Sequence, residues 1–454
     1  MSTKRGAGPL LPAAELVRGP VDPLALAGLP GLRAPAVVTV RGWTVVVADP
    51  VTVVDSLQSL DELGARCGWR EPAQAGLPPF TGGAVGYLSD DLSPAWLALP
   101  PDTRPATAQM PPLWLGWYDG AVCIAPCGEE VWLVARDVPG SSRSTPGARL
   151  RRLRGLVEAA RAAGAAPIVR PPERPRPVRV RPSLDRAAHT RGVRQTLEWI
   201  AAGDLYQLNL TLQLAVGWRA GGVSLARQLW AASPGAAHGA WLAPGGSGGV
   251  EIVSVSPETF LRGDGDQVTV RPIKGTRPRG HGRDDDAHAA ALTTSGKDAA
   301  EHVMIVDLER NDLGRVCVPG SVTVPELMAL EAHPTVWHLT STVTGRLRDD
   351  VGLAELFAAT FPSGSVTGAP KRMAVARAAL LEPVRRGVYC GAIGVVSRGL
   401  LDFSVAIRTA VLTGGLASYG TGGGIVAESD PDMEWDEAMD KAAAFFHATN
   451  TLPP

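Results

Sequence analysis

The stretch GAIGVVSRGLLDFSVAIRTAVL, residues 391–412, decides the fold class. It contains two apolar, β-rich runs, residues 391–397 and 403–412, joined by the short connection 398–402. Such a short connection predicts a hairpin of antiparallel strands, because parallel neighbours need a crossover of a dozen or more residues. We therefore expect a mixed α/β chain with antiparallel sheets and not a doubly wound parallel fold.

Helical and β-rich patterns alternate on both sides of this stretch. Helices are expected at residues 148–163, 189–202, 298–310, 371–380 and 434–448, and strands within 36–54, 131–135, 206–216, 251–255 and 267–270. A Pro/Arg-rich segment, PIVRPPERPRPVRVRP, follows residue 166. The pattern predicts a β-rich N-terminal lobe at 1–165, a linker or crossover at 166–183, and a C-terminal part at 184–454 that carries the chemistry.

Composition excludes several classes of protein. Of the 454 residues, 45% are hydrophobic and 20% are charged, which is the balance of a folded chain. A formal net charge of -1 provides no general attraction to nucleic acid or to anionic membranes. The sequence has neither a signal-peptide pattern nor an apolar run long enough for a membrane helix, so a cytoplasmic location is expected. The five cysteines are scattered, which favours reduced thiols.

Two pairs of acidic residues share the same spacing on two distant predicted helices. Asp298 and Glu301 form one pair, and Glu434 and Glu437 form the other. Positions i and i+3 share a helix face, so two facing pairs would make an all-oxygen site that suits Mg²⁺. Ordinary salt bridges within each helix, such as Glu437 with Lys441, are the alternative.

The glycine run Gly422–Gly424 and the nearby Arg408 indicate an anion site. We expect the glycines to form a loop after a strand, since glycine lets backbone N–H groups approach an anion closely. Arg408 lies in the apolar run SVAIRTAVL, where its guanidinium needs a partner, and a ligand carboxylate fits its geometry. A structural ion pair is an equally good interpretation of Arg408.

Lys274 and Glu258 are candidates for nucleophilic and acid/base chemistry. Lys274 stands in the segment RPIKGT, which we interpret as a turn after a strand, and burial there would lower its pKa. Glu258, in SPETF, could act as a general acid or base if it lies nearby. An exposed turn lysine and a glutamate at a helix start are the plainer alternatives.

Taken together, these segments resemble the chorismate-binding enzyme family over roughly residues 185–450, in particular its aminodeoxychorismate synthase and anthranilate synthase branches. The matching blocks are GDLYQLNLT (203–211), SPETFL (256–261), RPIKGTRPRG (271–280), AEHVMIVDLERNDLGRV (300–316), HPTVWHLTSTV (333–343), FPSGSVTGAPKRMA (361–374), YCGAIG (389–394), AIRTA (406–410) and GTGGGIVAESD (420–430). The resemblance implies a two-lobed α/β structure with an antiparallel β-sandwich core wrapped by helices and an active site in the cleft between the sheets.

The resemblance also assigns roles to residues. It implies that Glu301 and Glu437 bind Mg²⁺, with Asp298 and Glu434 in an outer shell. Positions that contact chorismate in the family correspond to Gly275, Thr276, Tyr389, Arg408, Gly422, Gly423 and Gly424. Lys274 would be the nucleophile, Glu258 the general acid and base, and His338 a residue that orients that region.

Two positions bear on the reaction. Family members that add water to chorismate resemble each other in having a lysine where this chain has Gln207, and glutamine cannot act as the base. At residue 274, lysine is typical of members that aminate carbon 4, whereas alanine is typical of those that make 2-aminobenzoate. The resemblance therefore implies amination at carbon 4, with 2-aminobenzoate formation, or a catalytically silent chorismate-binding subunit, as alternatives.

The source of ammonia is expected outside this chain. No nucleophile elbow with a cysteine is present, and Cys390 lies inside the strand-like block YCGAIG. The resemblance implies a separate glutamine amidotransferase partner, and it gives no reason to expect nucleic acid or a membrane as a partner.

Overall fold

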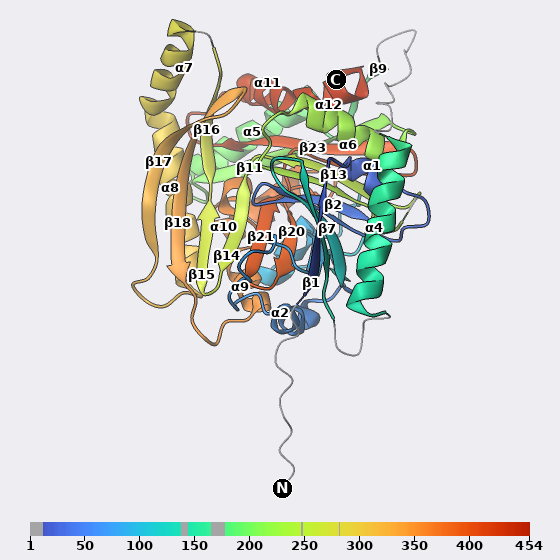
Figure 1. The fold of residues 1–454 in the computed structure, drawn as a ribbon. Helices are drawn as coiled ribbons and strands as arrows, with labels where there is room; N and C mark the ends of the chain where they lie inside the picture. The colour runs from blue at the N-terminus through green and yellow to red at the C-terminus, as the bar shows by residue number, and fades with distance from the viewer. Residues whose placement is uncertain (1–11, 138–143, 165–177, 247, 281) are drawn as a thin grey trace.

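Two large antiparallel sheets form the centre of the protein (Figure 1). The computed structural model describes residues 12–137, 144–164, 178–246, 248–280 and 282–454. Within these ranges the larger sheet has 12 strands and the smaller sheet has 10. The mixed α/β class with antiparallel sheets, expected from the hairpin pattern, is confirmed.

The larger sheet joins strands from the two ends of the chain. Its order is β1 (Ala13–Arg18), β8 (Glu130–Ala135), β7 (Gly120–Ile124), β3 (Trp43–Val47), β2 (Ala36–Val40), β12 (His238–Leu242), β13 (Glu251–Ser256), β22 (Thr409–Thr413), β23 (Leu416–Ile425), β11 (Gln207–Gly217) and β10 (Arg181–Pro182), and β19 (Gly368–Ala369) also pairs with β11.

The smaller sheet also joins strands from the N-terminal and C-terminal parts of the chain. Its order is β16 (Ile273–Pro278), β18 (Val336–Arg346), β15 (Gln267–Arg271), β14 (Thr259–Asp264), β21 (Leu400–Val405), β20 (Ala392–Ser397), β5 (Gly83–Leu88), β6 (Leu113–Tyr118) and β4 (Thr52–Val54), with β17 (Thr323–Ala332) on the outer side of β18. A short parallel pair, β9 (Val178–Arg179) with β24 (Thr451–Leu452), lies apart.

Alternation along the strands creates the sandwich. In β2, Val38 faces the core shared by the two sheets, whereas Val37 faces the helices that cover the larger sheet. In β20, Val395 likewise belongs to the shared core and Val396 to the core beneath the smaller sheet. This arrangement follows from the two-residue repeat of β-strands, which sends successive side chains to opposite faces.

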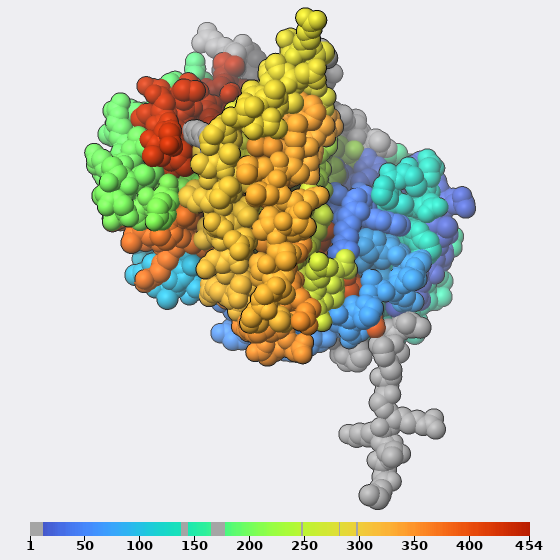
Figure 2. All heavy atoms as spheres, turned by 90° about the vertical axis from the view of Figure 1, so that its left-hand side faces the viewer, coloured from blue at the N-terminus to red at the C-terminus, as the bar shows by residue number. Residues whose placement is uncertain are grey.

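Helices cover the outer faces of both sheets. Along the larger sheet lie α5 (Arg186–Ala201), α6 (Gly221–Ala232), α11 (Pro431–Lys441) and α12 (Ala443–Thr449), at the top of Figure 1, and α4 (Pro146–Ala163) lies beside β8. Along the smaller sheet lie α2 (Leu60–Cys67), α8 (Gly296–Gly314) and α9 (Leu353–Thr360). Figure 2 shows the flank formed by α7 (Arg283–Thr293), α8 and β17, coloured yellow to orange.

The hairpin of residues 391–412 is present, but its second run is not one strand. Ser397 pairs with Leu400, and β20 and β21 are antiparallel. β21 ends at Val405, and β22 begins at Thr409 in the other sheet. Arg408 lies at this crossing with a φ of 52°. The expectation that Arg408 lies inside a strand was therefore wrong, because the chain changes sheets there.

Other differences are local. The expected helix at 434–448 is two helices, α11 and α12, which meet at Ala442. Both sheets take strands from before residue 137 and after residue 178, so the division into parts 1–165, 166–183 and 184–454 stays a prediction. Most of the expected linker, residues 166–177, lies outside the described residues. Over the described ranges, no helix has the length and apolar character needed to span a membrane.

Candidate active site

A bulge in β16 positions Lys274. The pairing of β16 with β18 shifts register between Ile273 and Thr276, and Gly275 has a φ of 83°. Lys274 therefore lies in a bulged strand and not in the turn that the sequence suggested. A β-bulge redirects side chains, and the positive φ explains why glycine follows the lysine.

The Lys274 amine lies among several charged groups. Its Nζ donates a hydrogen bond to the carbonyl oxygen of Ser365 at 3.3 Å. Burial lowers the pKa of Lys274, and the positive charge of Lys441 acts in the same direction, whereas the carboxylates of Glu301, Glu258 and Glu437 oppose the shift. A lowered pKa increases the neutral, nucleophilic fraction of the amine.

Glu258 lies beside Lys274 on the segment between β13 and β14, and not at a helix start. Its side chain is buried, with 4% of the residue surface exposed. Burial raises the pKa of Glu258 to about 7, although a hydrogen bond with the Ser365 side chain and the positive charge of Lys274 act against the shift. Its Oε1 has no hydrogen-bond partner among the described residues. A carboxyl group with this pKa can donate and accept protons at neutral pH.

The three glycines form part of a strand and not a loop, which corrects the expectation from sequence. Gly422, Gly423 and Gly424 lie within β23 and pair with Thr211, Leu210 and Asn209 of β11. The pairing of β23 with β22 ends at Tyr419, so no strand among the described residues covers the other edge of the glycine stretch. Backbone N–H groups on such an edge are available to an anion.

Side chains converge on the two faces of these glycines. A Cβ at Gly424 would lie 2.7 Å from Nε2 of Gln207 and 3.4 Å from Nζ of Lys274. A Cβ at Gly423 would lie 3.0 Å from Oε2 of Glu434 and 3.9 Å from Oε1 of Glu437. A methyl group at either position would have to displace these side-chain ends, so the glycines leave room for them.

The first acidic pair lies on α8 beside the bulge. Asp298 forms an ion pair with Arg277 of 2.8 Å, and its carboxyl carbon lies 3.4 Å from the position that a Cβ of Gly275 would occupy. Glu301 is partly buried and close enough to raise the pKa of Lys274. The helix thus brings Glu301 toward the amine, while Asp298 is engaged by an arginine.

The second acidic pair lies on α11. Glu434 is buried and accepts a hydrogen bond from Ser429 at 2.5 Å. Glu437 pairs with Lys441 at 2.7 Å, as in the helix salt bridge weighed above. Lys441 also donates to the carbonyl oxygen of Gly422 at 3.1 Å. Lys441 is a site residue that sequence reasoning took only for a salt-bridge partner.

The donor set fits Mg²⁺ without forming a complete protein cage. No group of three or more His, Cys, Asp or Glu residues that could hold a metal is found in the described parts of the chain. Mg²⁺ commonly uses one or two protein carboxylates and completes its shell with substrate oxygens and water. Glu301 and Glu437 both lie close enough to raise the pKa of Lys274, and they could supply those two carboxylates.

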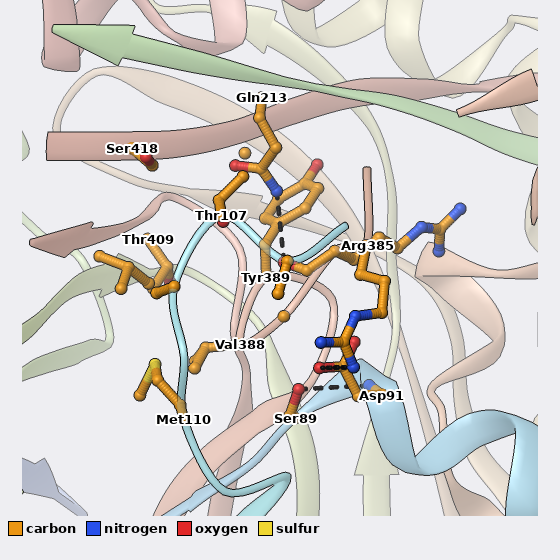
Figure 3. Close-up of a pocket in the computed structure, with 16 residues that line it drawn as sticks. Ser89, Asp91, Thr107, Met110, Gln213, Arg385, Val388, Tyr389, Thr409 and Ser418 are labelled. Atoms are coloured by element: carbon orange, nitrogen blue, oxygen red, sulfur yellow. Dashed lines mark hydrogen bonds and ion pairs between the residues drawn. The ribbon is translucent and has the colours of Figure 1, made fainter. Parts of the chain in front are cut away.

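Tyr389 lies against Gly420 of β23, and Arg408 directly precedes β22, which pairs with β23 as far as Tyr419. A Cβ at Gly420 would lie 2.1 Å from Cγ of Tyr389, so the ring packs directly on this glycine. Behind the ring is a cavity of about 20 Å³, whose lining includes Gln213, Thr409 and Ser418 (Figure 3). That volume holds about one water molecule. Gly420 belongs to the matching block 420–430, but no pattern in the sequence assigned it a role.

His338 and Thr276 form a pair on neighbouring strands. The Nδ1 of His338 and the Oγ1 of Thr276 are 2.9 Å apart. Burial lowers the pKa of His338 to about 4, and the positive charges of His333 and Arg408 add to the effect. His338 is therefore neutral at pH 7, and Arg408 lies close enough to influence it.

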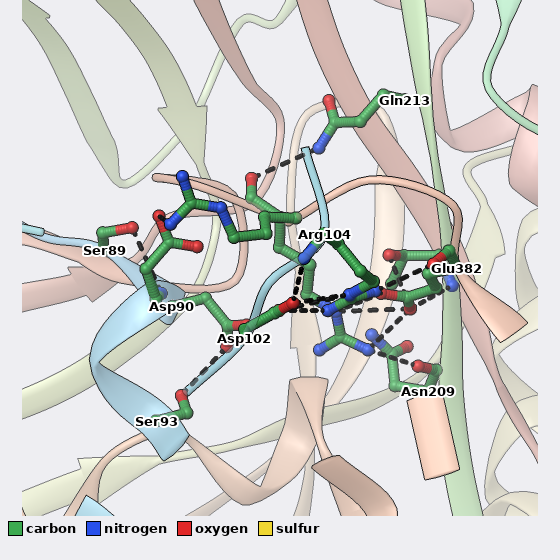
Figure 4. Close-up of polar contacts among 12 residues, drawn as sticks. Ser89, Asp90, Ser93, Asp102, Arg104, Asn209, Gln213 and Glu382 are labelled. Atoms are coloured by element: carbon green, nitrogen blue, oxygen red, sulfur yellow. Dashed lines mark hydrogen bonds and ion pairs between the residues drawn. The ribbon is translucent and has the colours of Figure 1, made fainter. Parts of the chain in front are cut away.

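A buried ion pair fixes β11 next to the site (Figure 4). Arg386 and Glu382 are 2.8 Å apart, and Glu382 accepts hydrogen bonds from the backbone and hydroxyl of Thr211 at 3.0 and 2.8 Å. Arg386 also donates to the carbonyl oxygen of Asn209 at 2.8 Å. These contacts hold the strand that carries Gln207 and faces the glycines.

The chain is similar to a known protein family and to curated relatives. The family model described as chorismate binding enzyme matches residues 42–447. The chain is 36% identical to aminodeoxychorismate synthase component 1 of Salmonella typhimurium, covering 90% of this chain and 85% of the relative. It is 37% identical to anthranilate synthase component 1 of Thermus thermophilus, covering 82% of this chain and 78% of the relative.

Solved structures show the same architecture. Anthranilate synthase component I of Streptococcus pneumoniae superposes with a TM-score of 0.71 at 25% identity, over 98% of this chain and 95% of that one. The menaquinone-specific isochorismate synthase of Escherichia coli superposes with a TM-score of 0.73 at 18% identity, over 98% and 96% of the two chains. On the family match and the identity of its relatives, the chain belongs to the chorismate-binding enzyme family.

Proposed function

We propose that the protein aminates chorismate at carbon 4 with ammonia, giving 4-amino-4-deoxychorismate, the precursor of 4-aminobenzoate. The observation that carries this proposal is Lys274, a partly buried amine with a lowered pKa beside the buried carboxyl group of Glu258. The proposed nucleophile, Lys274, and the proposed acid, Glu258, both form a hydrogen bond with Ser365.

The proposed reaction consists of two displacements. Lys274 attacks carbon 2 of the ring while the carbon 4 hydroxyl leaves with a proton from Glu258. Ammonia then attacks carbon 4, the bond from carbon 2 to Lys274 breaks, and Glu258 accepts a proton from the incoming nitrogen. Net retention at carbon 4 follows, and Lys274 and Glu258 return to their starting states.

Substrate binding is assigned to the groups around the glycine strand. The carboxylates and ring of chorismate would be bound by Arg408, Tyr389, Thr276, Gly275 and the backbone N–H groups of Gly422–Gly424. His338, neutral and paired with Thr276, would orient this region. Mg²⁺ bound to Glu301 and Glu437 would neutralise the ring carboxylate, with Asp298 and Glu434 outside them.

Ammonia is proposed to come from a glutamine amidotransferase partner. The relatives carry names ending in "component 1", which supports a second component. Gln207 supports ammonia over water as the nucleophile, because its buried amide cannot remove a proton from water.

A second candidate is formation of 2-aminobenzoate and pyruvate, as in anthranilate synthase. It is favoured by the 37% identity to the enzyme of Thermus thermophilus, which is within one percentage point of the 36% identity to the Salmonella typhimurium enzyme of the other branch. The test incubates the protein with chorismate, Mg²⁺ and ammonium and identifies the product by chromatography and mass. 4-Amino-4-deoxychorismate supports the proposal, whereas 2-aminobenzoate with pyruvate, or no turnover at all, contradicts it.

A further inference from the structure

One turn contacts both proposed reacting groups. The helical turn η3 (Gly364–Val366) lies between α9 and β19. The carbonyl oxygen of its Ser365 accepts a hydrogen bond from Lys274, and its side chain is hydrogen-bonded to Glu258. The position of this turn therefore sets the distance between nucleophile and acid.

Glu309 of α8 holds the start of this turn, Ser363 and Gly364, which we call its front. The Oε1 of Glu309 accepts hydrogen bonds from the backbone N of Gly364 at 2.9 Å and from the hydroxyl of Ser363 at 3.1 Å. The hydroxyls of Ser363 and Ser365 are 3.1 Å apart. Hydrogen bonds thus connect Glu309 to Ser365 through one intermediate hydroxyl.

The turn and the helix are in close contact at this point. A Cβ at Gly364 would lie 2.7 Å from Cδ2 of Leu308 and 3.2 Å from Oε1 of Glu309. Glu309 itself is 1% exposed. Water cannot replace the carboxylate oxygen in this space without moving the turn.

The last residue of the turn, Val366, which we call its back, is held by contacts that do not involve Glu309. The carbonyl oxygen of Val366 accepts hydrogen bonds from Nδ2 of Asn209 at 2.9 Å and from Nη1 of Arg386 at 3.1 Å. Loss of Glu309 would therefore release the front of the turn while the back stays attached, which tilts Ser365 and leaves the fold in place.

The charged groups around Glu309 are themselves paired. Lys371 and Asp312 are 2.5 Å apart, and Lys371 also donates to the carbonyl oxygen of Thr360 at 3.0 Å. Burial raises the pKa of Glu309, and the negative charge of Asp312 adds to this effect while Lys371 opposes it. Oε2 of Glu309 has no hydrogen-bond partner among the described residues. The turn contacts Oε1 alone, so an uncharged side chain with an oxygen at this position could accept the same two hydrogen bonds.

We propose that Glu309 is a positioning residue of the active site, which holds Ser363 and Gly364 so that Ser365 keeps Glu258 and Lys274 in reacting geometry. The inference rests on the proposed function only in taking Glu258 and Lys274 as the reacting groups. The part that concerns Glu258 holds for either amination product, because the contact between Ser365 and Glu258 does not depend on which carbon atom is attacked.

The test compares Glu309→Leu with Glu309→Gln. Glutamine keeps an oxygen acceptor, whereas leucine has a similar size and no acceptor. We measure disappearance of chorismate, so the identity of the product does not matter. In Glu309→Leu, kcat should fall about 100-fold with KM changed less than about 3-fold, and in Glu309→Gln kcat should stay within about 3-fold of wild type. Asp307→Asn, an exposed position on the same helix, is the control and should leave both constants unchanged.

A second measurement does not depend on turnover. Crystal structures of the two variants should show the turn at residues 363–366 displaced in Glu309→Leu and unmoved in Glu309→Gln. If Glu309→Leu does not fold, Ser363→Ala, which removes the link to Ser365, should lower kcat with KM unchanged. Normal kcat in Glu309→Leu, an unmoved turn, or equal damage in Glu309→Gln and Glu309→Leu would overturn the proposal. A wild-type protein that leaves chorismate intact would contradict the proposed function, and the crystal structures would still decide the role of Glu309.

Discussion

Gln207 and Lys274 meet on the same side of Gly424, where their Nε2 and Nζ atoms lie 2.7 and 3.4 Å from the position of a Cβ. The amide and the amine come from different sheets, since Gln207 is on β11 and Lys274 is on β16. The space in front of Gly424 is therefore where the two sheets present their functional groups to each other.

Replacing this glycine should close the space. In Gly424→Ala the added methyl group would collide with the Gln207 amide, so we expect loss of at least about 10-fold in kcat/KM for chorismate. Steady-state kinetics measures the loss. Gly217→Ala, on β11 where a Cβ meets no heavy atom within 4 Å, is the matched control. Unchanged kinetics in Gly424→Ala would mean that the site lies elsewhere.

Lys274→Ala should remove the nucleophile. We expect formation of 4-amino-4-deoxychorismate to fall by about three orders of magnitude or more, because alanine has no amine to attack carbon 2. Chromatography with mass detection follows this product and 2-aminobenzoate together. Near-normal formation of 4-amino-4-deoxychorismate by the variant would exclude Lys274 as the nucleophile.

The pH dependence should report Glu258. Because burial raises its pKa to about 7, the carboxyl group is protonated below that pH and can protonate the leaving hydroxyl. At constant free ammonia, kcat/KM for chorismate should therefore fall as the pH rises through about 7. In Glu258→Gln this limb should disappear, with activity lower by about 10²- to 10⁴-fold. An unchanged alkaline limb in the variant would assign it to another group.

Removal of divalent cations should abolish turnover. Treatment with a chelator is expected to stop chorismate consumption, and added Mg²⁺ should restore it. Glu301→Gln should raise the Mg²⁺ concentration needed for half-maximal activity by about 10-fold or more, since one of two carboxylates is lost. Glu428→Gln, at an exposed position before α11, should not change it. Full activity in chelator would contradict the metal site.

The buried pair of Arg386 and Glu382 should matter for stability. Arg386→Met removes the nearer of two guanidinium partners from the buried carboxylate of Glu382 and leaves only Arg104, at 3.3 Å. The loss should cost at most about 3–5 kcal/mol and should lower the midpoint of urea unfolding clearly. The exposed pair of Arg310 and Asp307 gives the control, because Arg310→Met should change stability by about 1 kcal/mol or less. Equal midpoints for the two variants would show that the buried pair contributes little.

Local patterns predicted the architecture well where the deciding contacts are local. The β20–β21 hairpin follows from two apolar runs and a short connection, and the i, i+3 spacing of Asp298 and Glu301 correctly placed them on one helix. The change of sheets at Arg408 could not be predicted, because β21 and β22 are both short, largely buried strands and neither sequence indicates to which sheet the strand belongs.

The site was predictable only in part, for a related reason. Lys274 and Glu258 carry recognisable chemistry, but the bulge at Gly275 and the strand position of Gly424 depend on pairing with distant strands. The contributions of Glu309 and Lys441 arise from contacts across the fold, with Gly364 and Gly422. Contacts between residues far apart in the chain cannot be predicted from the spacing of residues within a sequence segment.

Each of the two sheets contains strands from both the N-terminal and the C-terminal part of the chain, which limits how the chain can be shortened. A fragment that begins at residue 184 would lack β2, the neighbour of β12, and β5, the neighbour of β20. Both β12 and β20 would become open edges with apolar faces, which promote aggregation. Fragment libraries, split reporters and minimal versions of this enzyme should therefore keep the first strands, or supply them as a separate complementing peptide.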